Sequence, residues 1–264
     1  MFEKLVADVL DRVLGKYIVG FNREQLNIQV WRGDIRLEGL ELRKDAFHSF
    51  NLPVAVKAGY VGSITVRVPW TKLKSEPIEV NVSDVYCLVL PNSEWDENFE
   101  KDKKNQAKRE RIATAELLKK MAQGKPSEVR AEDSSMLVRI GTQIVNNLQL
   151  KIQNVHFRLE DSVTQPQHPF SIGITLESLS ARSTDASFVP AYVTQSTILH
   201  KLVKIENLAA YWNPGTSFSS MASLSTTELV STLSSIIARS HSRTAGAAEQ
   251  RYVLSPVNAS LRLA

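Results

Sequence analysis

The sequence is poor in cysteine and has no long run of apolar residues. Its single cysteine, Cys87, excludes a disulfide bond within the chain and is typical of a reducing compartment. No stretch reaches the roughly 18–20 consecutive apolar residues that a membrane-spanning helix requires. Charged residues, among them Glu3 and Lys4, interrupt the start of the chain, which therefore does not resemble a secretory signal. We expect a protein that works on the cytosolic side of membranes.

The usual signatures of an enzyme are also missing. The five histidines are scattered, no two lie at the spacing of zinc ligands, and there is no glycine-rich phosphate loop or nucleophile elbow. His156, followed by Arg158 and Glu160, has the most charged surroundings. On a strand these three side chains share one face, and we expect hydrogen bonds and ion pairs at the surface. We predict no catalytic residue, no metal site and no cofactor.

Positive charge is concentrated in one block of the chain. The formal net charge is only +4, yet lysines and arginines crowd residues 101–120 with few acidic residues among them. Such a block attracts nucleic acid or an anionic membrane surface. Nucleic-acid binding usually also needs interleaved aromatic side chains or a recognition helix, and this block has neither. We predict no nucleic-acid partner, while a solvated helix or connector and a membrane-surface segment both stay open.

Much of the chain alternates between apolar and polar residues. Ile64 and Val66 fall on one side of a strand, whereas Thr65 and Arg67 fall on the other. A period of two is typical of antiparallel strands with one buried side. The pattern slips by one residue at Gly39, where we expect a β-bulge. Strands are expected at about 26–31, 34–42, 60–69, 78–90, 148–160, 170–181, 198–212 and 251–263.

Other segments favour helix. Apolar residues recur every three or four positions in 2–19, which predicts an amphipathic helix. This helix either caps the end of the sheet or touches a membrane, and in the second case Phe2 and Leu5 form its tip. Segment 96–146 is charged and expected to be helical, whereas 215–250 is rich in Ser, Thr and Ala and is expected to hold a loosely packed helix in a flexible insertion.

We expect one domain over residues 1–264. Its parts are a capping helix at 1–19, first strands at 26–90, the helical segment 96–146, and further strands at 148–264 that include the 215–250 insertion. The fold class is therefore β-rich α+β. Too few helices are predicted to cover the apolar sides of the strands, which leaves an open apolar sheet face or two sheets that cover each other. Alternation continues to the last residues, so we expect a piece of a longer protein.

Several motifs recur in the order known from one protein family. They begin with Leu14-Gly15-x-Tyr17 and Trp31-x-Gly33, continue with Val68-Pro69-Trp70, and return in the blocks 154–161 and 252–257. With these motifs the chain resembles the N-terminal chorein region of the vacuolar-protein-sorting family of bridge-like lipid transfer proteins. The resemblance spans nearly the whole chain.

The resemblance implies a fold and a function. The fold would be a strongly curved antiparallel sheet that forms a hydrophobic scoop, capped by the N-terminal helix. The function would be non-vesicular transfer of glycerophospholipids between membranes at contact sites, with acyl chains sliding along an apolar groove. The chain would lie on the cytosolic face of membranes, with this end towards the endoplasmic reticulum, and adaptor proteins would bind regions outside it.

A set of inward-pointing apolar residues is our prediction for the lipid-binding groove. An apolar groove discriminates poorly between headgroups, because each buried methylene contributes about 0.8 kcal/mol whatever the headgroup. An adaptor or tether without lipid cargo remains the alternative function. Packing under the capping helix is the alternative to lipid contact for each predicted groove residue. The predicted groove residues are Ile28, Val30, Ile35, Leu37, Ile64, Val66, Val68, Val80, Val82, Leu150, Ile152, Ile172 and Ile174.

Overall fold

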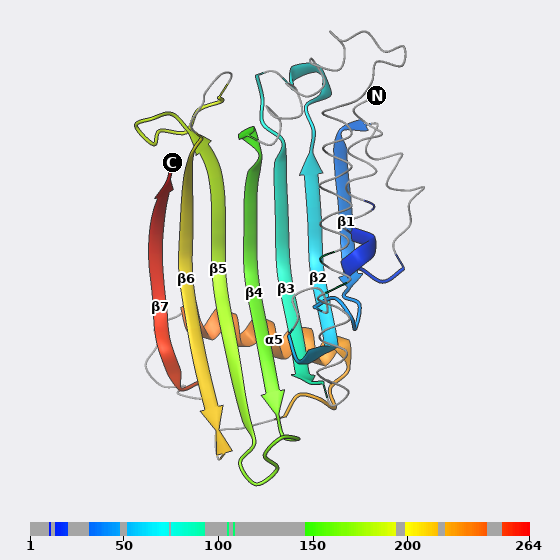
Figure 1. The fold of residues 1–264 in the computed structure, drawn as a ribbon. Helices are drawn as coiled ribbons and strands as arrows, with labels where there is room; N and C mark the ends of the chain where they lie inside the picture. The colour runs from blue at the N-terminus through cyan, green and yellow to red at the C-terminus, as the bar shows by residue number, and fades with distance from the viewer. Residues whose placement is uncertain are drawn as a thin grey trace.

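A single seven-stranded sheet dominates the computed structural model of the chain (Figure 1). The structure describes residues 11, 14–20, 32–47, 52–73, 75–92, 105, 108, 146–193, 199–215, 220–241 and 250–264. Within them lie the strands β1 (Asp34–Glu41), β2 (Val54–Arg67), β3 (Glu79–Pro91), β4 (Gln149–Asp161), β5 (Phe170–Thr184), β6 (His200–Pro214) and β7 (Tyr252–Leu263), the short 3-10 helix η2 (Trp70–Lys72) and the helix α5 (Thr226–His241).

The strands lie side by side in the order in which they occur along the chain. All neighbours pair antiparallel except β3 and β4, which pair parallel. The prediction of a purely antiparallel sheet is therefore wrong. A parallel pair requires a crossover of a dozen or more residues, which the long connection between Pro91 and Gln149 provides.

Some predicted elements fall outside the described residues. These include the strand at 26–31 and nearly all of the helical segment 96–146. Of the predicted N-terminal helix, residue 11 and residues 14–17 are described as helical. Leu14 and Ile18 are buried there and pack against Val61 of β2.

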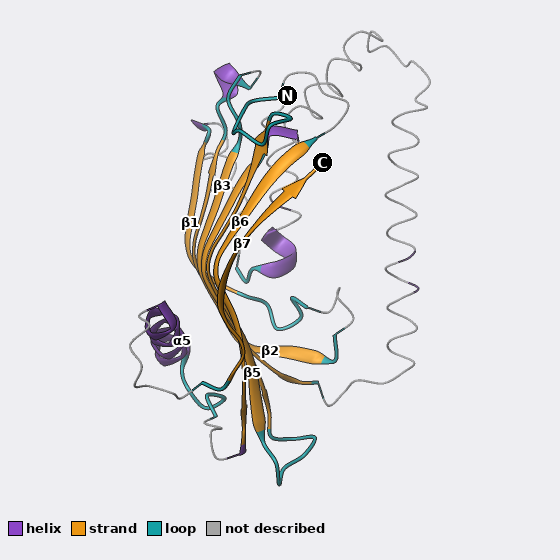
Figure 2. Cartoon of the chain, turned by 90° about the vertical axis from the view of Figure 1, so that its left-hand side faces the viewer, coloured by secondary structure: helices purple, strands orange, loops and turns teal. Residues whose placement is uncertain are grey.

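A line of kinks crosses the sheet at one level. Gly39, Asp84, Asn154 and Asn207 all have positive φ angles, between 50° and 62°. Glycine, aspartate and asparagine are the residue types that adopt this conformation most readily. These residues, which we call the kink line, lie beside the continuous cross-strand row Leu40–Val61–Val85–Val155–Leu176. Figure 2 shows the strands changing direction together about half-way along their length.

Polar side chains join the kink line across the strands. The Asn154 amide donates a hydrogen bond of 2.8 Å to the Asp84 carboxylate, and the Asn207 amide donates one to Glu177. The backbone N–H of Asn207 donates to Asn258 Oδ1 at 2.7 Å. The hydrogen bonds therefore run between neighbouring strands at the level where each strand bends.

The kinks shift the alternation of every strand together. In β3, Val82 and Val85 both pack against the segment around Leu14, although a regular strand would place them on opposite faces. At Gly39 the pairs Glu38–Ser63 and Leu40–Val61 keep the register on both sides. The slip seen in the sequence at Gly39 is thus a kink that both strands share, and the predicted one-sided bulge is wrong.

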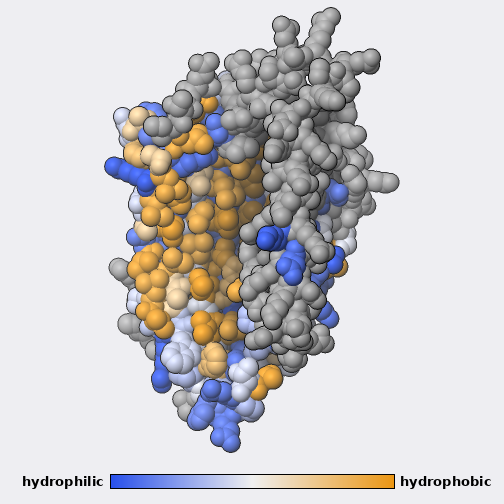
Figure 3. Space-filling model, in the orientation of Figure 1, coloured by the Kyte–Doolittle hydropathy of each residue, from blue (hydrophilic) through white to orange (hydrophobic). Residues whose placement is uncertain are grey.

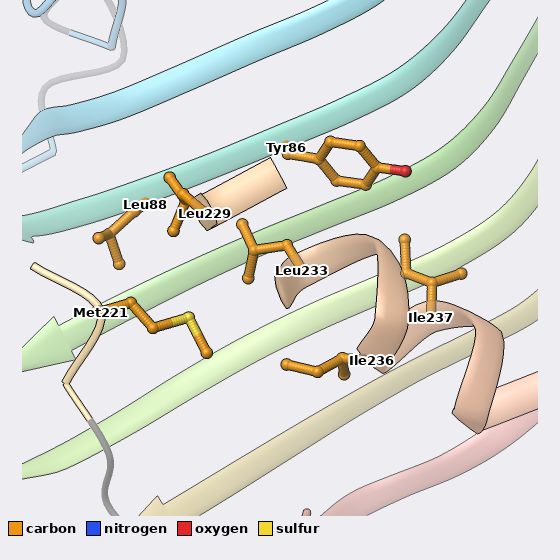
Figure 4. Packing of buried hydrophobic residues seen from close by; sticks show 7 residues of the cluster. All are labelled: Tyr86, Leu88, Met221, Leu229, Leu233, Ile236 and Ile237. Carbon is orange, nitrogen blue, oxygen red and sulfur yellow. The ribbon is translucent and has the colours of Figure 1, made fainter. Parts of the chain in front are cut away.

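Helix α5 covers the lower part of one sheet face (Figures 1 and 2). Its N-terminus carries a capping box, in which the Ser225 N–H donates to Glu228 and the Glu228 N–H donates to Ser225 Oγ. Its apolar side is buried against Tyr86 and Leu88 of β3 (Figure 4). The expected loose packing of this helix is therefore wrong. The buried helix residues are Leu229, Leu233, Ile236 and Ile237.

Candidate functional site

The sheet face opposite α5 carries exposed apolar side chains. Tyr86 points to α5, whereas the next residue, Cys87, belongs to a separate cluster with Val56 on the other side of the sheet. We call that other side the apolar face. Figure 3 shows it as a broad hydrophobic surface over β4 to β7. Its most exposed members, between 38% and 52% accessible, are Ile172, Ile174, Trp212, Leu254, Val257, Leu261 and Leu263.

The register arranges most of the predicted groove residues in two rows, on the side of the kink line where β3 and β4 begin. Ile35, Val66, Val80 and Leu150 are consecutive cross-strand partners, and so are Leu37, Ile64, Val82 and Ile152. Ile172 and Ile174 lie on the other side of the kink line, where they pair with Leu159 and Phe157. Because of the phase shift, all of these residues share the apolar face.

The same residues differ greatly in exposure. Ile35, Val66 and Val68 are at most 5% accessible and form a packed cluster with Ile78. Ile172 and Ile174 are 41% and 49% accessible. The half-buried members of the set are Leu37, Ile64, Val80, Val82, Leu150 and Ile152. Ile28, Val30, Phe2 and Leu5 lie outside the described residues. The accessible part of the apolar face is therefore concentrated in β5 to β7.

The sequence prediction omitted the contributions of β6 and β7. Trp212 is half exposed and lies directly opposite Ile172. In β7, Val257, Leu261 and Leu263 are exposed apolar residues along one edge of the sheet. A signal was present in the alternation of residues 257–263, which is as regular as that of β5.

The opposite face holds a buried polar core under α5. His156, Arg158 and Glu160 are at most 2% accessible, so the predicted surface position is wrong. The cause is α5, which covers this side of β4 and lies about 70 residues further along the chain. The loop that follows Asp161 joins β4 to β5, and its residues 162–168 are exposed.

Hydrogen bonds run through this polar core in one direction. Leu233 of α5 offers a carbonyl oxygen 3.1 Å from His156 Nδ1, so Nδ1 donates the hydrogen bond. Nε2 then accepts from the Tyr211 hydroxyl at 2.9 Å, and Tyr211 accepts from Arg158 at 3.3 Å. The pKa of His156 is lowered to about 4, mainly by burial. The hydrogen bond to the Leu233 carbonyl raises this pKa, and the nearby charge of Arg158 lowers it. The imidazole is therefore neutral.

Glu160 fixes the segment that leads into α5. Its carboxylate accepts hydrogen bonds from Arg158 Nε at 2.8 Å and from the Met221 N–H at 2.9 Å. The Ser220 hydroxyl donates a third at 2.9 Å. Such full pairing is what a buried charge needs to be tolerated. The arrangement holds α5 on the sheet and gives these polar residues a structural role.

The described residues hold neither a metal-binding cluster nor a membrane-spanning helix. Among the described residues no cluster of three or more His, Cys, Asp or Glu side chains could hold a metal ion. No helix in the described part of the chain has the length and apolarity needed to cross a membrane. The exposed side chains of the apolar face make it the candidate site.

Comparison with known proteins identifies the family. The model of the "VPS13-like family N-terminal region" matches residues 1–264. The intermembrane lipid transfer protein VPS13 of Chaetomium thermophilum is 41% identical over 81% of this chain. Dictyostelium discoideum vps13A is 33% identical and human VPS13D 32% identical, each over 100% of the chain. The aligned parts are only 7%, 8% and 6% of these relatives, so the chain spans less than a tenth of their length. The chain belongs to the VPS13-like family and corresponds to its N-terminal region.

Proposed function

We propose that the chain binds lipids by their acyl chains on the apolar face and takes part in their transfer between membranes. The observation that carries this proposal is that the helix covers the more polar face of the sheet and leaves the more apolar face accessible. Helix α5 covers polar residues of β4 and β5, while Ile172 and Ile174 on the other face stay accessible. Soluble monomers rarely expose a continuous apolar patch beyond about 300–600 Å² unless it binds something.

The energy available from this face is sufficient to hold a lipid. Complete burial of a Leu or Ile side chain contributes about 2 kcal/mol, so a half-exposed one can still gain about 1 kcal/mol. The seven most exposed members together can gain about 7 kcal/mol when acyl chains cover them. None of this depends on the headgroup, which supports a broad class of glycerophospholipids as cargo.

The names of the relatives support lipid transfer as the function of the longer proteins. They are named intermembrane lipid transfer proteins, and this chain corresponds to 7% of the Chaetomium thermophilum relative. We propose that acyl chains slide along a groove to which this segment contributes one part. We further propose a peripheral position on the cytosolic face of contact sites that involve the endoplasmic reticulum, with adaptors bound to other regions. No chemical step is required of the chain, and we propose that it is not an enzyme.

The experiment that tests this proposal is direct identification of bound lipid. The purified chain is examined by native mass spectrometry, and extracted lipids are then identified. Bound glycerophospholipids with mixed headgroups are expected. A well-folded sample that carries no lipid, and takes up none from phosphatidylcholine vesicles, would contradict the proposal and favour an adaptor or tether.

A further inference from the structure

A cavity of about 560 Å³ lies where the apolar face ends, between the β4–β5 loop, the end of β6 and the start of β7. We call it the terminal pocket. Its volume is within the range of about 300–1,000 Å³ that is typical of small-molecule sites. In Figure 3 the lower end of the apolar surface gives way to hydrophilic side chains. The residues that line the pocket include Asp161, Thr164, His168, Phe170, Trp212 and Arg251.

One wall of the terminal pocket continues the apolar face. Phe170 lies two residues before Ile172 in β5 and therefore on the same side of the strand. Its ring meets the Trp212 indole edge to face, with 6.4 Å between the centroids. Trp212 is 50% accessible and pairs with Ile172 in the register. An acyl chain on Ile172 and Ile174 would thus lead directly into this pocket.

The other wall is polar and includes the cation Arg251. The backbone of Arg251 is held in place, because its N–H donates to Asn213 Oδ1 at 2.9 Å and its carbonyl accepts from the Trp212 N–H at 2.8 Å. Among the described residues no carboxylate or carbonyl accepts a hydrogen bond from its guanidinium group. The exposed guanidinium group therefore lines the pocket without a protein counter-ion among the described residues.

Asp161, the acidic residue of the pocket, is engaged by its own loop. One carboxylate oxygen accepts from the N–H groups of Val163 and Thr164, at 3.1 and 2.9 Å, and the other accepts from the Thr164 hydroxyl. Burial alone would raise the pKa of Asp161, but these hydrogen bonds lower it below its ordinary value. The carboxylate shapes the loop and is directed to Thr164, which leaves Arg251 as the permanently charged cation that lines the pocket.

We infer that the terminal pocket binds the anionic group of an amphiphile, a phosphate or a carboxylate, whose acyl chain lies on the apolar face. A guanidinium group binds both anions through paired hydrogen bonds. This inference rests on the proposed function and adds a rule of selectivity. Phosphatidylcholine and phosphatidylserine carry the same phosphodiester, so both should be accepted alike, whereas diacylglycerol lacks the anion and is held more weakly.

The test compares fluorescent lipids with equal acyl chains. Vesicles carry labelled phosphatidylcholine, phosphatidylserine, fatty acid or diacylglycerol, and the amount taken up by the chain is measured. Arg251→Gln is compared with Arg182→Gln, which changes an exposed arginine of β5 outside the pocket. Circular dichroism checks that both variants are folded.

The wild-type chain is expected to retain both phospholipids equally and diacylglycerol about tenfold less, as for the loss of one charge-assisted hydrogen-bonded pair. Arg251→Gln should remove this preference, and Arg182→Gln should keep it. A response of the fatty acid alone would assign the site to a carboxylate. Equal retention of diacylglycerol and phospholipid by the wild type, or equal behaviour of the two variants, would overturn the inference while the proposed function stands. Failure to take up any of the four lipids would instead refute the proposed function.

The orientation of the lipid provides a second readout. Bromine atoms quench indole fluorescence at short range, so phosphatidylcholine brominated near its carbonyl end should quench the chain more than phosphatidylcholine brominated near its methyl end. The wild type minus Trp212→Phe isolates the fluorescence of Trp212 from that of the other three tryptophans, and this Trp212 signal should be quenched more by the carbonyl-end bromines. A stronger effect of the methyl-end bromines would place the anionic group away from Arg251 and would also overturn the inference.

Discussion

Two carboxylates placed on the accessible part of the apolar face should abolish lipid binding without unfolding the protein. The change is Ile172→Asp combined with Ile174→Asp. The two side chains are 41% and 49% accessible, so each contributes about half of the 2 kcal/mol of a fully buried isoleucine. With the lower strand propensity of aspartate, the total cost is about 3 kcal/mol, which is below the stability of a typical domain of 5–15 kcal/mol.

The effect on lipid is expected to be much larger. An acyl chain that crosses the two positions would have to remove water from two carboxylates, which costs several kcal/mol for each unpaired charge. Native mass spectrometry should therefore show at least a tenfold loss of bound phospholipid, while circular dichroism shows a cooperative melt. The pair Ile172→Leu and Ile174→Leu is the matched control and should keep both the lipid and the fold.

A second comparison separates the open and the packed parts of the face. Val66 is only 5% accessible, within the cluster of Ile35 and Val68, and Val66→Asp should leave the chain unfolded. If the Ile172/Ile174 double variant keeps its lipid, the proposed binding face is wrong. If it unfolds as Val66→Asp does, the face is packed in solution and the reasoning from its exposure fails.

Three further changes test the rest of the fold. The pKa of His156 is lowered to about 4 in the folded chain, below the ordinary 6.5, so its contribution of about 3 kcal/mol is present above pH 6.5 and is lost as the pH falls to 4. The melting temperature of the wild type should decrease as the pH is lowered through this range, and that of His156→Gln should depend less on pH. An equal pH dependence of the two melting temperatures would refute the buried neutral imidazole. Gly173→Ala places a Cβ 2.2 Å from the Tyr211 ring and should cost about 3 kcal/mol in urea unfolding, and an unchanged midpoint would contradict the close approach. Gly62→Ala places a Cβ 2.7 Å from that of Asp84 at the kink line and should cost about 2 kcal/mol in the same assay, whereas no loss would mean that the kink relaxes freely.

Local patterns in the sequence predict the strands well, because side chains of a strand alternate between two faces. The alternation assigns Ile64, Ile152 and Ile174 to one side of their own strands. The register shows that these sides belong to one face of the sheet. The slip at Gly39 was visible for the same reason. The shared kink line was not, because asparagine and aspartate at positions 84, 154 and 207 are as common in loops and surfaces as at positive φ.

Long-range relations could not be read from local patterns. Nothing in β3 or β4 alone indicates that they pair parallel, because that depends on the path of the connection between them. The burial of His156 follows from α5, which is distant in the sequence. The capping box of Ser225 and Glu228 and the spacing of Leu229 and Leu233 did mark a firm helix, but the serine-rich surroundings suggested a loose one.

The central claim, that acyl chains lie on the apolar face, is tested most directly by photo-crosslinking. The chain is loaded with phosphatidylcholine that carries a photoreactive group in its acyl chain, illuminated, digested and examined by mass spectrometry. Adducts are expected on peptides of β5 to β7 that contain Ile174, Trp212 or Leu261, and not on the helix α5. Adducts concentrated on α5, or spread evenly over both faces of the sheet, would contradict the account.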